Sequence, residues 1–117
     1  FRKAEAYQAN VDDYDEMATL NVISGAIKIE TILNNAATVT TDTTNTWADA
    51  ATKTLQINVS AAGVVTYLID DAAPTTVAAY TFDNNEQVVP FIFMLHGADL
   101  AGAVELYEWE VGLQNVS

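Results

Sequence analysis

Residues 53–70 constrain the fold of this chain more than any other stretch. Residues 55–59 (LQINV) alternate apolar and polar side chains, which is the pattern of a strand with one buried and one solvated face. The following turn contains Gly63, which can adopt positive φ, and residues 64–69 return as a run rich in β-branched and aromatic side chains. The stretch therefore predicts a β-hairpin and an all-β fold class.

Other segments also have the composition of strands, and turn-forming residues separate them. We predict strands over these residues: 21–33 (bent at Gly25), 38–41, 76–82, 88–96 and 103–111. Residues 1–9 fit either a strand or a helix. Such spacing predicts an antiparallel β-sandwich. The predicted core consists of Ile23, Ile27, Ile29, Leu55, Ile57, Val59, Phe91, Phe93, Leu95 and Trp109.

The length of 117 residues suits one domain, 1–117, with a single hydrophobic core. Because its first residue is Phe1, the sequence also fits a part of a longer chain. It contains no cysteine, which excludes disulfides, thiolate metal sites and thiol catalysis.

The charge balance is strongly acidic, with a net charge of −12 and four basic residues. The chain lacks a basic stripe to neutralise phosphates, so we expect neither nucleic acid nor an anionic membrane surface as a partner. No apolar run reaches the length of a membrane span. An acidic surface also discourages unspecific aggregation.

The segment 88–96 (VVPFIFMLH) is apolar on both faces of the predicted strand. A strand of a two-layer sandwich is expected to be polar on its outer face. Three interpretations are open: a loop covers the outer face, a second subunit covers it, or it contacts a larger assembly. In the last two, Val88, Ile92 and Met94 form the assembly contact.

Glu108 and Glu110 lie on one face of the predicted strand 103–111, as paired carboxylates do in glycoside hydrolases. The other interpretation is a solvated face, and we favour it because the remaining parts of a catalytic site are missing. His96, the only histidine, has no recognisable nucleophile motif. We therefore predict no enzyme and no catalytic residue.

Two further groups of residues have binding chemistry. The acidic residues of the 10–16 loop offer hard oxygen ligands, but they depart from the D-x-D-x-D-G spacing of a calcium loop; they are Asp12, Asp13, Asp15 and Glu16. We expect a solvated loop there and no metal or cofactor, with calcium binding left open. Three aromatic residues suit stacking on a sugar ring or core packing, namely Trp47, Tyr67 and Tyr80.

Three segments resemble strands of the concanavalin A-like lectin/glucanase superfamily. They are 54–59 (TLQINV), 63–70 (GVVTYLID) and 106–112 (LYEWEVG), with Trp47 upstream. The resemblance implies a lectin-like jelly-roll sandwich. The hydrolases of this superfamily use an E-x-D-x-x-E motif, whereas this chain has only Glu108 and Glu110, without the central Asp. The resemblance therefore does not imply glucanase activity.

The chain is also similar in composition to tailed-bacteriophage virion proteins: it is rich in Ala, Thr and Asn, with FRKAEAY near its start and PFIFMLH near its end. This implies a non-enzymatic capsid-surface or decoration protein on the virion surface. Its partners would be copies of itself and a major capsid protein. The alternative is a carbohydrate-binding module that stacks glycans on Trp47, Tyr67 and Tyr80.

Overall fold

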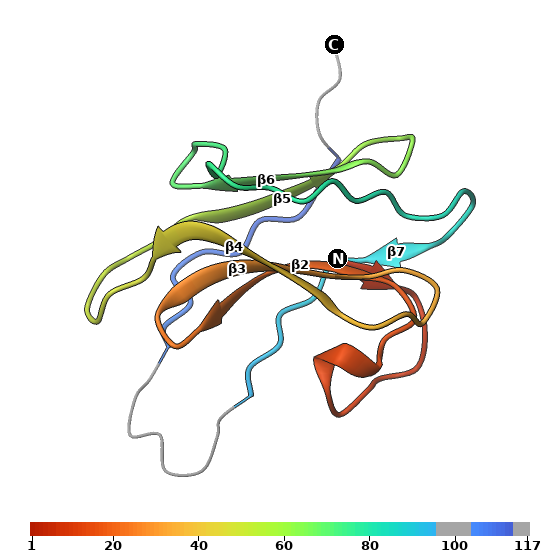
Figure 1. Ribbon diagram of the computed structural model, residues 1–117, viewed down its shortest axis with the longest axis horizontal. Coiled ribbons are helices and arrows are strands. Elements are labelled where there is room, and N and C mark those ends of the chain that lie inside the picture. Colours follow the sequence, from red (N-terminus) through yellow and green to blue (C-terminus); the bar gives the residue numbers. More distant parts are fainter. Residues whose placement is uncertain (96–103, 114–117) are drawn as a thin grey trace.

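The computed structural model describes residues 1–95 and 104–113 of the chain. Their architecture is all-β, with seven strands in two antiparallel sheets that form two layers (Figure 1). The strands are β1 (Arg2–Lys3), β2 (Met17–Ile23), β3 (Ala26–Ile32), β4 (Val39–Thr46), β5 (Leu55–Val59), β6 (Val65–Ile69) and β7 (Val88–Val89). A single 3-10 turn, η1 (Val11–Asp13), precedes β2.

The larger sheet has the strand order β4-β3-β2-β1-β7. Its centre is a tight hairpin in which Ile23 of β2 pairs with Ala26 of β3. Ser24 and Gly25 form the turn with φ values of 50° and 77°, as a two-residue type I′ turn requires. The prediction of one bent strand over 21–33 is therefore wrong, because the chain reverses at Gly25.

The edge strand β4 contains the predicted short strand 38–41 only in part and extends to Thr46. Its pairing with β3 is interrupted by a register shift between Ala26 and Lys28. The buried Thr43 hydroxyl donates a hydrogen bond to the carbonyl of Ile27 at 2.6 Å. This bond holds the irregular part of β4 against β3.

The smaller sheet is the hairpin predicted from the sequence. Strand β5 pairs with β6 in a continuous register from Leu55 opposite Ile69 to Val59 opposite Val65. Gly63 has a φ of +79° in the connecting turn. The hairpin prediction is thus confirmed, including the need for a glycine at this position.

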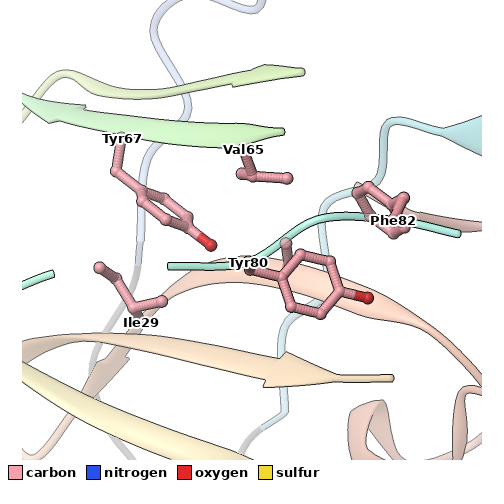
Figure 2. Close-up of a cluster of buried hydrophobic side chains, with 6 residues drawn as sticks. Ile29, Val65, Tyr67, Tyr80 and Phe82 are labelled. Carbon is pink, nitrogen blue, oxygen red and sulfur yellow. The ribbon is translucent and has the colours of Figure 1, made fainter. Parts of the chain in front are cut away.

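The hydrophobic core lies between the two sheets (Figure 2). Ala18 and Ile29 come from the larger sheet, and Val65 and Tyr67 come from β6. Two buried aromatic residues on the segment after β6, Tyr80 and Phe82, complete this cluster and pack edge to face with ring centroids 5.0 Å apart. The Tyr80 hydroxyl donates to the carbonyl of Ile32 at 2.5 Å, which ties this segment to β3.

A second buried group lies on the opposite face of the larger sheet. Strand alternation places Met17 and Ile32 on that face, yet both are fully buried, as is Tyr14 from the loop before β2. The Arg2 guanidinium lies 4.5 Å from the centre of the Tyr14 ring. The centres of the Tyr14 and Phe91 rings lie 5.8 Å apart. A loop and the chain after β7 therefore cover this face in part.

Three predicted strands differ from the structure. Residues 76–82 form only an isolated bridge, between Thr81 and Val64. In the segment 88–96 only Val88–Val89 pairs as β7, because Pro90 has no N–H to extend the ladder. Residues 104–111 form no strand, and all of them are exposed. His96 and Ala103 lie outside the described residues.

The predicted core is correct for its central members. Ile27 and Ile29 are buried, and Ile57 and Val59 pack against the core cluster. Leu55, Phe91 and Phe93 are half-buried. The prediction is wrong for three residues that are exposed to solvent, Ile23, Leu95 and Trp109. The turn at Gly25 turns Ile23 outward, and the other two lie on segments that no strand covers.

The Gly63→Ala substitution should destabilise the fold more than Gly25→Ala. Both glycines have positive φ, so each alanine incurs a left-handed strain of about 1–2 kcal/mol. A Cβ at Gly63 would also lie 2.7 Å from the carbonyl oxygen of Phe82, whereas a Cβ at Gly25 meets nothing closer than 3.6 Å. Urea unfolding of the two variants measures the difference, and equal losses would contradict the close approach of Phe82.

Candidate functional site

Two segments near the C-terminal end carry more than half of the exposed large apolar residues among those described. We name them the C-terminal apolar segments, residues 91–95 and 104–113. Their exposed members are Ile92, Met94, Leu95, Val104, Leu106, Tyr107, Trp109, Val111 and Leu113. Monomeric proteins rarely expose so much apolar surface in so short a stretch. These segments are therefore the candidate functional site.

The local sequence explains why the first segment leaves the sheet. Pro90 ends the β7 ladder, and the chain then turns below the larger sheet, where Phe91 contacts the Tyr14 ring (Figure 1). The second segment, deep blue in Figure 1, is a trace without a strand that passes from the level of the larger sheet to that of β5 and β6. Among the described residues its backbone forms no hydrogen bond.

The structure places the three predicted assembly residues differently from one another. Ile92 and Met94 are about half exposed. Val88 is half-buried and packs against the core cluster between the sheets. Ile92 and Met94 are thus accessible to a partner, while most of Val88 is used inside the fold.

A cavity of about 270 Å³ lies beside the second C-terminal apolar segment. It opens to solvent and has a mixed lining of apolar residues, two polar residues and the end of the second segment, namely Phe1, Ile57, Val59, Val88, Asn58, Ser60, Gly112 and Leu113. The cavity therefore joins the space between the two sheets to the C-terminal end of the described chain.

The basic residues of the chain are all engaged within the fold. Lys3 pairs with Asp15 at 2.8 Å and with Glu86 at 3.1 Å, and the two hydrogen bonds raise the pKa of Lys3. Lys28 pairs with Asp42 at 3.0 Å and Lys53 with Asp70 at 2.6 Å. Arg2 lies against the Tyr14 ring. A partner that binds through acidic groups would find these cations already paired.

Hydrogen bonds also hold the two aspartates of these pairs in their charged form. The pKa of Asp42 is lowered by the backbone N–H of Thr44 and by Lys28. The pKa of Asp70 is lowered by Lys53 and by the backbone N–H of Thr54. Asp42 lies within β4 and its ion pair joins β4 to β3, whereas Asp70 follows β6 and its ion pair joins that end of β6 to the residues before β5.

Glu16 is a buried carboxyl, a group often found at active sites, and the sequence did not distinguish it from the other acidic residues of the loop. Its side chain is fully buried, with Oε2 accepting a 3.3 Å hydrogen bond from the backbone N–H of Asp83 and Oε1 without a partner. Burial raises the pKa of Glu16, and the nearby Asp83 and Glu86 carboxylates act in the same direction. A buried carboxyl of this kind is found at many active sites, but here it connects β2 to the 83–86 turn.

The acidic loop before β2 does not gather its carboxylates. Asp12 and Asp13 are exposed, Asp15 binds Lys3, and Glu16 points into the fold. Within residues 1–95 and 104–113, no group of three or more acidic or histidine side chains is arranged to hold a metal ion.

The three predicted sugar-stacking residues do not come together. Tyr67 and Tyr80 are 2% and 8% exposed and belong to the core (Figure 2), so of the two roles open to them the structure shows core packing, and their sugar-stacking role is wrong. Burial raises the pKa of Tyr67 to about 12. Trp47 is half-buried, and its indole N–H donates to the carbonyl of Ala51 at 2.7 Å. Only Trp47 has a ring that a ligand can reach.

Glu108 and Glu110 are exposed on the second C-terminal apolar segment. The neighbouring Tyr107 hydroxyl donates to Glu105 at 2.7 Å, so the polar contact in this region is made by a different glutamate. The sequence pattern found the two carboxylates, but the structure does not place them in a strand. The solvated position that the sequence favoured for both carboxylates agrees with their exposure, and the catalytic pairing stays the untested alternative.

Comparisons with protein-family models, curated proteins and solved structures gave no significant match. In the part of the chain that the structure describes, no helix has the length and apolar character to cross a membrane.

The Glu16→Gln substitution should make stability less sensitive to pH. Burial raises the pKa of Glu16 above its ordinary value of 4.5, so the folded chain binds this proton more tightly than the unfolded chain. Wild-type stability should therefore fall as the pH rises above that value. The gain of Glu16→Gln over wild type should grow as the pH rises above 4.5 and level off once Glu16 is ionised in the folded chain as well, as measured by urea unfolding.

The matched control is Glu108→Gln, which removes one charge from an exposed position. If both variants change the pH profile alike, the effect is that of net charge, and the burial argument for Glu16 is wrong.

Proposed function

We propose that this chain is a non-enzymatic structural protein that acts by packing against copies of itself and against a larger lattice. The observation that carries the proposal is the exposure of the C-terminal apolar segments, which have little cover within the described fold. Burying apolar surface is the dominant favourable term in most protein association. A chain that exposes such an apolar surface is suited to a structural role in which it binds other protein surfaces.

The more specific form of this proposal is a bacteriophage virion protein of the capsid surface, such as a decoration protein, with a major capsid protein as a further partner. Its support is the sequence resemblance, together with the exposure of Ile92 and Met94. We also propose that the two antiparallel sheets belong to a lectin-like jelly-roll sandwich. The core shared by β2, β3 and β6 supports that arrangement.

The alternative is a carbohydrate-binding module. One observation favours it: the Trp47 indole is held by its bond to Ala51, and part of its ring faces solvent. A fixed aromatic face is suited to a sugar ring. The alternative now rests on this one residue, because Tyr67 and Tyr80 are in the core.

Purified chain should scatter light with at least twice the mass of one chain, and it should bind no sugar on a glycan array. The physical reason is that the C-terminal apolar segments become buried between copies. A lectin would instead bind some glycan and lose that binding in Trp47→Ala. A monomer at high concentration with a clear glycan signal would contradict the proposal.

Self-association should become tighter as salt is added. The net charge of −12 and the paired state of the lysines mean that copies repel one another at long range. Raising ionic strength from about 0.01 M to about 0.15 M shortens the Debye length from about 30 Å to about 8 Å. Sedimentation should show association stronger by roughly threefold or more. An interface held by ion pairs would weaken instead.

A further inference from the structure

We propose that residues 104–113 add as a β-strand to the open edge of β5 in a second copy of this chain, and that two copies exchange this strand reciprocally. The inference rests on the proposed function, because it names the partner and the contact of the proposed self-packing. It joins two features that the described fold leaves unpaired, an edge and a strand-forming segment.

The open edge is the side of β5 that faces away from β6. Backbone hydrogen bonds link Ser60 to Val64 at 2.9 Å and Asp70 to Thr54 at 2.8 Å at the two ends of the hairpin. Antiparallel pairing alternates, so the N–H and C=O groups of the odd-numbered residues 55, 57 and 59 point to the other side. Among the described residues these groups have no hydrogen-bond partner. Unpaired edges of this kind are templates for strand addition.

The segment 104–113 has the pattern that such an edge accepts. Its odd-numbered side from 107 onward is entirely apolar, with Tyr107, Trp109, Val111 and Leu113. Its even-numbered side from 107 onward carries Glu108 and Glu110, followed by Gly112. A strand with this alternation would place its aromatic side toward the space between the sheets and its glutamates toward solvent.

The cavity beside β5 is suited to the aromatic side of the added strand. It has a volume of about 270 Å³, opens to solvent, and is lined by Phe1, Ile57, Val59 and Val88 together with the polar Asn58 and Ser60. A cavity of roughly 150 Å³ is known to hold a benzene ring, so the volume beside β5 is sufficient for the ring of Tyr107 or Trp109. Filling it would extend the core shared by the two sheets.

The other open edges are less suited to this strand. Strand β4 is dominated by threonine and carries Asp42 on its outer face. Strand β7 has only two residues. Strand β5 offers five residues with Leu55, Ile57 and Val59 on the side toward the core, so an apolar strand gains most by pairing there.

The amount of exposed apolar surface indicates a second copy as the occupant. The six large apolar residues of 104–113 are each more than half exposed, and a standard interface buries roughly 800 Å² on each partner. Gly112 and Leu113 lie beside the β5 edge of their own chain without pairing to it. Because every copy has both the strand and the edge, two copies close as a symmetric dimer.

The test uses the absence of cysteine from the chain. Asn58→Cys places a thiol on the outer side of β5, and Glu108→Cys and Glu110→Cys place one on the matching side of the segment. Mixing the β5 variant with either segment variant under mild oxidation should give a disulfide-linked dimer, identified by mass spectrometry. The control is Thr40→Cys on the other exposed edge, β4, which should give at least tenfold less cross-link.

Double variants with both thiols in one chain separate pairing within a copy from pairing between copies. A disulfide formed only within the chain would overturn the proposal, as would equal cross-linking to Thr40→Cys. If light scattering shows a multimer but the β5 cross-link is absent, this inference fails and the proposed self-packing stands. If the chain is a monomer, both fail.

A second variant tests the strand without thiols. Trp109→Pro removes a backbone donor and blocks strand pairing, in a segment whose backbone forms no hydrogen bond in the described chain. We expect an unchanged far-UV spectrum and melting profile of the isolated chain, with self-association at least tenfold weaker. Trp109→Phe, which keeps the donor and an aromatic ring, should retain association; equal association in both variants would overturn the proposal.

Discussion

The apolar contact between the two sheets is the constraint on which the rest of this structure depends. The hairpin of β5 and β6 has only two strands, and an isolated two-stranded hairpin is marginal in water. It pairs with none of the strands of the larger sheet, so side chains must hold it there. Val65 and Tyr67 do this from the hairpin, with Tyr80 as the residue that both fills the core and binds the β3 backbone.

The sequence predicted the parts of the fold that local pattern determines. The 55–69 hairpin followed from alternation and a glycine turn, and its register agrees. The same alternation led to the wrong prediction of one strand over residues 21–33. The alternation of apolar and polar side chains continues through a two-residue turn, so two short strands look like one long strand. Ser24 and Gly25 carried the true signal. Tyr14 could not have been predicted in the second buried group, since a loop residue has no periodicity to show which face it covers.

The candidate site was likewise predictable only where the local sequence pattern determines it. Composition identified the unusual apolar character of 88–96 and 103–111, but a pattern describes only the side chains of a strand. A strand also needs a neighbouring strand that pairs with its backbone N–H and C=O groups. The side-chain pattern of a segment does not show whether a distant part of the chain supplies that neighbour. Glu16 was missed for a related reason. The backbone N–H that its buried carboxylate accepts from belongs to Asp83, 67 residues away along the chain, and its neighbours in the sequence form an acidic loop.

Charge and apolar exposure act against each other in this molecule. The chain uses its four basic residues internally, three in ion pairs and one against an aromatic ring, so the other charged side chains of the described surface are acidic. Such a surface opposes contact between copies at long range but has little effect on atoms already in contact, where screening and apolar burial decide. The edge of β5 and the segment 104–113 are neutral along their apolar sides, which makes them the region where contact costs least. An acidic body with an apolar strand is therefore consistent with an assembly that forms at defined contacts and resists unspecific aggregation.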